Sequence, residues 1–179
     1  KGAFLADTDA TNVTGTELVT NGTFDSDVSG WSASEATISV VSGRLRVTNT
    51  AANGEAYQGF ATQIGKKYVL TVECFTGTAG ASYYLSNDAP NQYTGFSGTS
   101  GYESGVTGVR SKTFTASATT TYIRLEVASS GVGSYAEFDN VSVRLAEEDR
   151  SVNNKGLQVF GTVTKTPVAT GAELVGYGN

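Results

Sequence analysis

The 179-residue sequence contains no histidine and no methionine, and it has only two prolines and one cysteine. Without histidine, the chain cannot form a Ser-His-Asp or Cys-His catalytic group or a histidine-ligated zinc site. The single cysteine, Cys74, allows neither an internal disulfide nor a cysteine zinc site. The sequence also has no signal peptide and no run of about 18 apolar residues, so we expect no membrane insertion.

Charged residues are few and are not clustered by sign. Seventeen acidic residues stand against twelve basic ones, and the net charge is −5. The basic residues are too scattered to neutralise a row of phosphates, so nucleic acid is not an expected partner. A glycosidase could still use two carboxylates about 5–9.5 Å apart, but the acidic residues form no paired motif. The sequence therefore predicts no enzymatic activity.

The sequence is rich in strand-favouring residues and in turns, with 22 glycines. Short apolar segments separated by turn residues predict an all-β fold in which two antiparallel sheets form a sandwich. The predicted strands are Glu17–Val19, Ala36–Val41, Arg44–Asn49, Tyr57–Ile64, Lys67–Phe75, Ala81–Ser86, Lys112–Thr115, Thr120–Ala128 and Tyr135–Leu145. The residues predicted to be buried are Ile38, Val40, Leu45, Val47, Leu70, Val72, Ile123, Leu125, Val127, Val141 and Val143.

Alternation within these segments indicates which side chains face the core. Ser42-Gly43 joins two alternating segments and predicts a hairpin with a short turn. The even-numbered positions of the segment 68–75 are apolar and include Cys74, which we interpret as a core residue rather than a reactive thiol. In the segment 122–127 the odd-numbered residues are aliphatic, so Tyr122, Arg124 and Glu126 should share the opposite face.

The pattern divides the chain into a module and two flanks. Residues 1–16 predict a linker, 17–145 a folded module, and 146–179 a β-structured connector or the start of a following domain. The chain is expected to be a fragment, and Gly171-Ala172-Glu173-Leu174-Val175 resembles Gly15-Thr16-Glu17-Leu18-Val19. This repeat suggests that another strand-led domain begins there, although coincidence is the alternative for so short a match.

The ends of the predicted module carry motifs of a known family. Glu17-Leu18-Val19-Thr20-Asn21-Gly22-Thr23-Phe24-Asp25, then Gly30-Trp31, and finally Phe138-Asp139-Asn140-Val141-Ser142-Val143 resemble the opening and closing motifs of galactose-binding-like carbohydrate-binding modules. Tyr57-Gln58 and Gly65-Lys66-Lys67-Tyr68 match two inner strands of that family. The resemblance covers about residues 17–145. It implies a jelly roll, with sugar bound by aromatic residues on a concave face or in edge loops.

The same resemblance implies a structural calcium ion. Asp139 matches the family carboxylate that holds calcium together with backbone carbonyls, and Asp25 is a second candidate ligand. The alternative for Asp139 is a turn residue that bonds nearby backbone N–H groups. Trp31 resembles the family's structural tryptophan, so we expect it in the core and not in a ligand site.

A sugar site requires aromatic faces with polar side chains around them. Tyr83 and Tyr84 are adjacent on one strand, so their rings must point to opposite faces. The irregular stretch 87–109 is long enough to be either functional or disordered. The predicted ligand-binding residues are Tyr83, Tyr84, Tyr93, Tyr102 and Arg124. For each of these residues, ordinary packing on the sandwich is the alternative.

The C-terminal segment suggests where such a module acts. Residues 150–169 resemble a connector of bacteriophage and environmental viral tail or fibre proteins. The sequence therefore predicts a non-catalytic carbohydrate-binding or adhesion module, extracellular or on a virion surface, whose partner is a glycan or polysaccharide. The alternative is a structural module of a tail fibre or filament that contacts other copies, for example as a homotrimer, without binding sugar.

Overall fold

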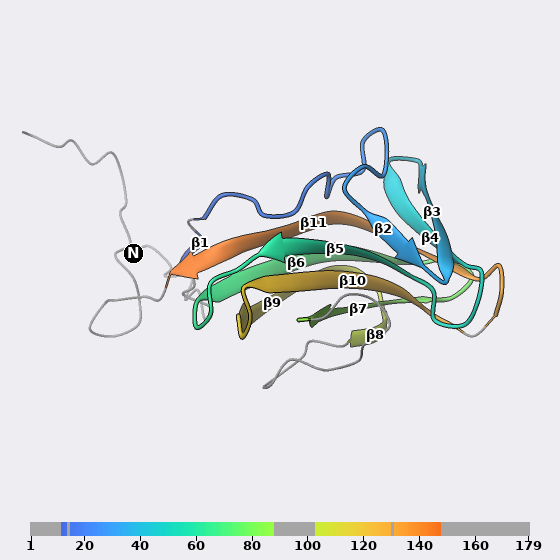
Figure 1. Ribbon diagram of the computed structural model, residues 1–179. Helices are drawn as coiled ribbons and strands as arrows, with labels where there is room; N and C mark the ends of the chain where they lie inside the picture. Colours follow the sequence, from blue (N-terminus) through green and yellow to red (C-terminus); the bar gives the residue numbers. More distant parts are fainter. Residues whose placement is uncertain (1–11, 14, 88–102, 130, 148–179) are drawn as a thin grey trace, which may run out of the picture. The chain divides into compact units, whose positions relative to one another are not determined.

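Two antiparallel β-sheets make up the part of the chain that the structure describes. The computed structural model describes residues 12–13, 15–87, 103–129 and 131–147, which belong to one unit, Thr11–Glu148. These residues contain strands and turns and no helix, so no segment among them is a helix able to span a membrane. The architecture confirms the predicted all-β, two-sheet jelly-roll sandwich (Figure 1).

The first sheet has the strand order β3-β4-β11-β6-β9, and β1 pairs with the far end of β11. Its strands are β1 (Asn12–Val13), β3 (Ala36–Val41), β4 (Arg44–Asn49), β6 (Lys67–Thr76), β9 (Gly108–Thr115) and β11 (Tyr135–Glu147). The second sheet has the order β2-β5-β10-β7-β8. Its strands are β2 (Ser32–Ser34), β5 (Glu55–Ala61), β7 (Gly80–Ser86), β8 (Glu103–Val106) and β10 (Thr120–Ala128).

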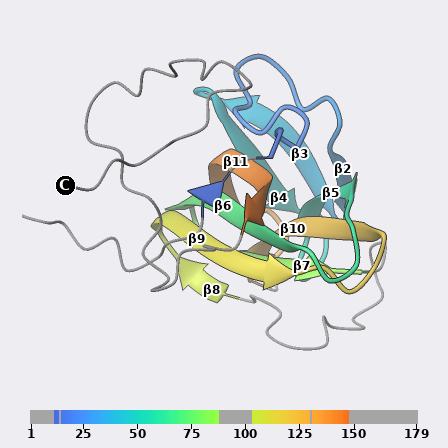
Figure 2. The same cartoon turned by 90° about the vertical axis from the view of Figure 1, so that its left-hand side faces the viewer.

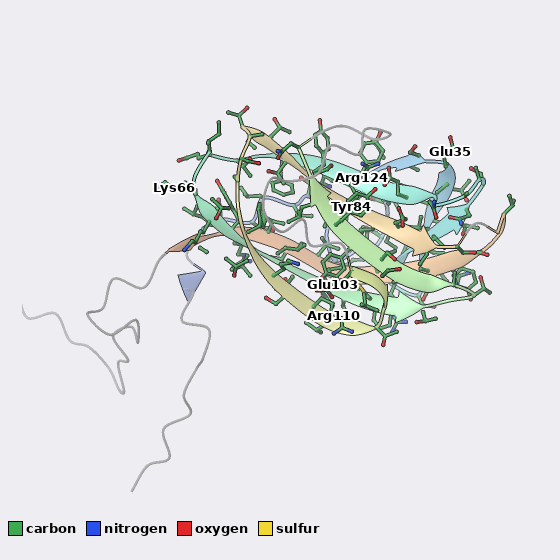
Figure 3. The ribbon with its side chains drawn as sticks, turned by 90° about the horizontal axis from the view of Figure 1, so that it is seen from below. Glu35, Lys66, Tyr84, Glu103, Arg110 and Arg124 are labelled. Carbon is green, nitrogen blue, oxygen red and sulfur yellow. The ribbon has the colours of Figure 1, made fainter. Side chains whose placement is uncertain are left out.

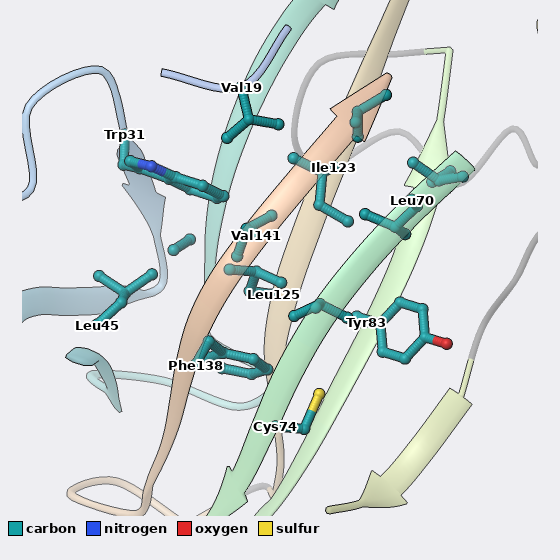
Figure 4. Packing of buried hydrophobic residues seen from close by; sticks show 14 of the residues in the cluster. Val19, Trp31, Leu45, Leu70, Cys74, Tyr83, Ile123, Leu125, Phe138 and Val141 are labelled. Atoms are coloured by element: carbon teal, nitrogen blue, oxygen red, sulfur yellow. The ribbon is translucent and has the colours of Figure 1, made fainter. Parts of the chain in front are cut away.

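The core lies between the two sheets and follows the predicted alternation. Tyr68, Leu70, Val72 and Cys74 on β6 all face it (Figure 4). Burial raises the pKa of the Cys74 thiol to about 12, so it is a packing residue rather than a nucleophile. Trp31 is also buried, as expected. Its indole nitrogen donates hydrogen bonds to the Thr20 and Asn21 carbonyl oxygens at 3.1 and 3.2 Å.

The predicted hairpin between β3 and β4 is confirmed. Ser42 and Gly43 both have positive φ, 53° and 74°, which is the conformation of the two-residue turns that match strand twist. At the other side of the sandwich, β8 and β9 are separated by one residue, Thr107, yet they belong to different sheets (Figure 2). The chain therefore crosses between the sheets at that margin.

Some details of the prediction were wrong. Ile38 and Val40 are only half-buried, because β3 is the edge strand of the first sheet. The segment Glu17–Val19 is not a strand, although Leu18 N donates to Val143 O at 3.0 Å and the segment runs beside β11. β1, β2 and β8 were not predicted, since two to four residues without strong alternation give little signal.

Candidate functional site

The outer face of the second sheet carries polar and aromatic side chains, most of which are themselves buried. These side chains alternate along β5, β10 and β7 with buried residues such as Ala56, Ile123 and Leu85. The face consists of Glu55, Tyr57, Gly59, Ser82, Tyr84, Ser86, Tyr122, Arg124 and Glu126. The strands β10 and β11 bend together, with β10 on the inner side of the bend (Figure 1). This outer face is therefore the concave one.

Strand register arranges the face in rows across β5, β10 and β7. Arg124 lies directly between Tyr57 and Tyr84 in the central row. Tyr122 lies between Gly59 and Ser86 in one neighbouring row, and Glu126 lies between Glu55 and Ser82 in the other. The face thus places three tyrosines around one guanidinium and two carboxylates.

A buried ion pair between Arg124 and Glu55 occupies the centre of the face. Figure 3 shows Arg124 next to Tyr84 on this face. Arg124 donates from both Nε and Nη2 to the two carboxylate oxygens of Glu55, with the Nε bond at 2.8 Å. Tyr84 donates its hydroxyl to the same carboxylate at 2.7 Å, and its ring centroid lies 4.9 Å from the Arg124 guanidinium carbon. All three side chains are at least nine-tenths buried. Bidentate pairing of this kind fixes the position of both groups.

Burial is also the main reason that the pKa of Tyr84 is raised above its ordinary value, and the hydrogen bond and negative charge of Glu55 raise it further. The Tyr84 hydroxyl is therefore a neutral donor at any ordinary pH. Arg124 was predicted to donate to sugar hydroxyls, and the structure places its Nε and Nη2 groups on Glu55 instead. A role for Tyr84 or Arg124 in ligand binding stays a prediction.

The ring of Tyr122 lies next to Gly59 on the neighbouring strand. A side chain at Gly59 would place its Cβ 2.7 Å from Tyr122 Cε1 and 3.1 Å from Cδ1, so the ring occupies the space above the glycine. Tyr122 itself is half-buried. No ring or cation contact with another described residue covers this tyrosine.

A similar pair on the first sheet has a different environment. A side chain at Gly77 would overlap the ring of Tyr135, as a side chain at Gly59 would overlap the ring of Tyr122. The guanidinium carbon of Arg46, however, lies 4.1 Å from the centroid of the Tyr135 ring, and Arg46 is bonded to Glu137 at 2.6 Å. Because an arginine already stacks on Tyr135, this ring is less suited than Tyr122 to receive a ligand.

The other predicted ligand residues lie elsewhere. Tyr83 points into the core, where its side chain is fully buried, so the two adjacent tyrosines do face opposite sides of the sheet (Figure 4). Burial raises the pKa of Tyr83 above its ordinary value, and the nearby Glu103 carboxylate adds to this effect. Tyr93 and Tyr102 lie outside the described residues.

The candidate calcium ligands lie where β11 meets the turn after Val19. Asp139 accepts a hydrogen bond from Asn140 N at 2.7 Å, and Asn140 Nδ2 donates to Glu73 at 3.0 Å. The pKa of Asp139 is raised, first by burial and then by the charges of Glu73 and Asp25. These carboxylates are the hard oxygen donors that calcium takes.

The number of side-chain donors is nevertheless small. Among the described residues, no three Asp, Glu, Cys or His side chains are grouped closely enough to hold a metal ion. A calcium ion at Asp139 would therefore need backbone carbonyl oxygens or water molecules for most of its six to eight ligands. Carboxylate oxygens are the type of ligand that calcium prefers. The assignment of Asp139 and Asp25 as calcium ligands stays a prediction.

No protein-family model and no curated protein matches the sequence. Solved structures share its fold. A CBM4 structure has 17% sequence identity and a TM-score of 0.53, over 70% of this chain and 98% of that one. The N-terminal cellulose-binding domain of β-1,4-glucanase C from Cellulomonas fimi has 19% identity and a TM-score of 0.53, over 73% and 97%. At these identities the likeness shows the jelly-roll fold that carbohydrate-binding modules have.

A further solved structure with this fold is the enzymatically active domain of tailspike protein 4 from bacteriophage CBA120. It has 17% identity and a TM-score of 0.51, over 72% of this chain but only 21% of the tailspike chain. The fold therefore occurs both as a separate module and as one part of a much longer chain.

Sequence reasoning missed the two residues that organise the face, Glu55 and Gly59. Glu55 meets Arg124 across 69 positions of sequence, and nothing local to either residue signals the pair. Gly59 interrupts a predicted strand, and a glycine within a strand marks a close approach of another group. Combined with Tyr122 on the outward face of its own strand, that signal could have suggested the pair.

Proposed function

We propose that this chain is a non-catalytic module that binds a neutral polysaccharide on the concave outer face of the second sheet. The observation that supports the proposal is the ring of Tyr122, which occupies the side-chain space of Gly59 in the row next to Tyr57 and the Glu55–Arg124–Tyr84 network. Pyranose rings present a face of C–H groups that stacks on such a tyrosine ring. Polar groups in the neighbouring rows can bond the hydroxyls at the edge of the sugar.

The charges on the face favour a neutral ligand over an acidic one. The face has two acidic side chains, Glu55 and Glu126, and one basic side chain, Arg124, which pairs with Glu55. The net charge of the whole chain is also negative, at −5. A polymer of uronic acids or sulfated sugars would be repelled by this face, whereas an uncharged chain would not.

Affinity electrophoresis in native gels tests the proposal. Gels would contain soluble cellulose derivatives, xylan or β-1,4-galactan as neutral polysaccharides, and alginate or polygalacturonate as acidic ones. The module should be retarded by at least one neutral polymer and by neither acidic polymer. Retardation by the acidic polymers alone would contradict the assignment of a neutral ligand, and unchanged migration in every gel would contradict sugar binding.

A location of the module outside the cell or on a virion surface belongs to the same proposal, and the jelly-roll fold shared with a phage tailspike supports it only at the level of fold. The second candidate function is a structural module of a fibre. An oligomer in solution, together with unchanged migration in all the gels, would favour that alternative.

A further inference from the structure

The first residues of the module run along the last strand, β11, and hold it through a short segment that we name the clasp, residues 15–22. Gly15 N donates to Leu145 O at 3.3 Å, Leu18 N donates to Val143 O at 3.0 Å, and Val141 N donates to Gly22 O at 2.9 Å. Leu18 packs against the core and Val19 belongs to it. The clasp thus attaches the N-terminal end of the module to its C-terminal strand.

Two positions of the clasp require glycine. A Cβ at Gly15 would lie 2.7 Å from both the Cβ and the backbone nitrogen of Leu145. A Cβ at Gly22 would overlap the carbonyl oxygen of Val141. Because the obstacles are largely backbone atoms, they cannot move aside as a long side chain could.

A third position requires a carboxylate. Glu17 accepts hydrogen bonds from Val143 N at 2.8 Å, from Ser142 Oγ at 2.5 Å and from Arg144 Nε at 3.2 Å. It also accepts hydrogen bonds from Leu18 N and Val19 N, both at 3.0 Å. One side chain therefore bonds five groups, three of them on β11, and no other residue type has enough acceptor capacity at this reach.

The sequence of the clasp occurs a second time near the C-terminus. Residues 15–22 align with Gly171-Ala172-Glu173-Leu174-Val175-Gly176-Tyr177-Gly178. The five clasp residues described above are identical in the second copy: Gly15, Glu17, Leu18, Val19 and Gly22. Glu173 corresponds to Glu17, and Gly178 corresponds to Gly22. The residues that the geometry of the clasp demands are therefore the ones that are repeated.

The positions that differ are mostly those the clasp does not use. The side chains of Thr16 and Thr20 are exposed, and they correspond to Ala172 and Gly176. Asn21 is the exception, since it has a φ of 51° and its amide bonds Asp27, whereas Tyr177 takes its place in the second copy. A tyrosine at such a φ is strained, so this position is the weakest part of the match.

We propose that residues 171–179 are the clasp of a second sandwich of this same type. They form the first segment of that sandwich, as residues 15–23 form the first segment of the described one. The clasp position on β11 in the first module is already filled by Gly15–Gly22. The surface that residues 171–179 fit is consequently the last strand of another module, with a backbone like that of Val141–Leu145. The chain is then one unit of a tandem array joined through residues 148–170.

A fusion protein tests the proposal directly. It consists of the full 179-residue chain followed by a second copy of residues 24–147, so that residues 171–179 stand where residues 15–23 stand in the first copy. Trp31 is the only tryptophan of the parent chain, and its indole bonds clasp carbonyls. With Trp31→Phe in the first copy, tryptophan fluorescence during urea unfolding reports on the appended copy alone. A reference fusion carries the sequence of residues 15–23 at positions 171–179.

The appended copy should show the emission of a buried tryptophan and unfold cooperatively, at a urea midpoint below that of the reference fusion because of Tyr177. Glu173→Ala should lower that midpoint, and Glu17→Ala should not. Tyr177→Asn should raise it. The proposal is overturned if the appended copy is unfolded both with and without Tyr177→Asn while the reference fusion folds. It is overturned equally if Glu17→Ala, and not Glu173→Ala, destabilises the appended copy.

Discussion

The ring of Tyr122 on β10 occupies the space that a side chain at Gly59 on β5 would need, so a side chain there would displace the ring. This pairing sets the position of a half-buried aromatic ring on the outer face of the sheet. A glycine in the middle of a strand costs stability, and Gly59 itself stays exposed beside the ring. The pair thus joins a local weakness of the strand to a surface suited to a sugar ring.

Gly59→Val should therefore weaken polysaccharide binding. The added methyl groups would displace the Tyr122 ring from the sheet, and we expect a loss of about 1–2 kcal/mol, roughly 5- to 30-fold in Kd. Ala61→Val is the matched control, because it adds a branched side chain on the same strand and face opposite Thr120 rather than Tyr122. Equal affinity of the Gly59 variant and the parent, by isothermal titration calorimetry, would contradict the proposed role of Tyr122.

The buried pair of Glu55 and Arg124 should be important for stability. Glu55→Gln leaves the Arg124 charge buried without its carboxylate, and breaking a buried pair in this way costs about 3–5 kcal/mol. Glu55→Met combined with Arg124→Met should recover part of that loss, because neither partner then leaves the other charge buried alone. Urea unfolding measures both variants.

Glu103→Gln provides the exposed control for this prediction. Glu103 and Arg110 are 3.9 Å apart and both are more than one-third exposed, so removing the pair should cost less than about 1 kcal/mol. If Glu55→Gln were no more destabilising than Glu103→Gln, the central ion pair would not have the role assigned to it here.

Glu17 should make stability depend on pH. Burial raises its pKa, but hydrogen bonds from Ser142, Val19, Val143 and Arg144 outweigh burial, and the net pKa is lowered. A lowered pKa in the folded state means that Glu17 contributes stability above its unfolded pKa and loses it as the pH falls through the folded value. Melting temperatures of the parent should therefore fall more steeply than those of Glu17→Gln between about pH 5 and pH 3. Parallel curves of melting temperature against pH for the parent and Glu17→Gln would contradict this role of Glu17. Glu35→Gln, which changes an exposed carboxylate, is the control.

Calcium binding at Asp139 should change the stability of the module when the metal is added or removed. The pKa of Asp139 is raised, so without a cation its charge opposes folding as the pH rises through that pKa. A bound calcium ion would offset this repulsion, and at about 100 times Kd it would add roughly 2.7 kcal/mol to the free energy of unfolding. Calcium should raise the melting temperature of the parent but not of Asp139→Asn. Identical melting curves in calcium and in excess chelator would contradict calcium binding and indicate that Asp139 is only a turn residue.

The sequence predicted the sheets better than the site. Alternation along Thr120–Ala128 correctly placed Ile123 and Leu125 in the core and Arg124 on the opposite face. The pattern could not show that Glu55 would meet Arg124, because strand neighbours are chosen by the topology of the whole sandwich. It also gave no sign of β8, whose four residues pair with β7 through an irregular register.

Calorimetric titration of the module and of Tyr122→Ala with the neutral polysaccharide that retards the parent most strongly in gels tests the central claim most directly. Tyr135→Ala is the matched control, since it removes the tyrosine that lies over Gly77 on the other sheet. Loss of affinity by about 10-fold or more in Tyr122→Ala, about 1.4 kcal/mol, with little change in Tyr135→Ala, is the predicted result. Equal affinities of all three proteins would contradict a sugar site on the second sheet.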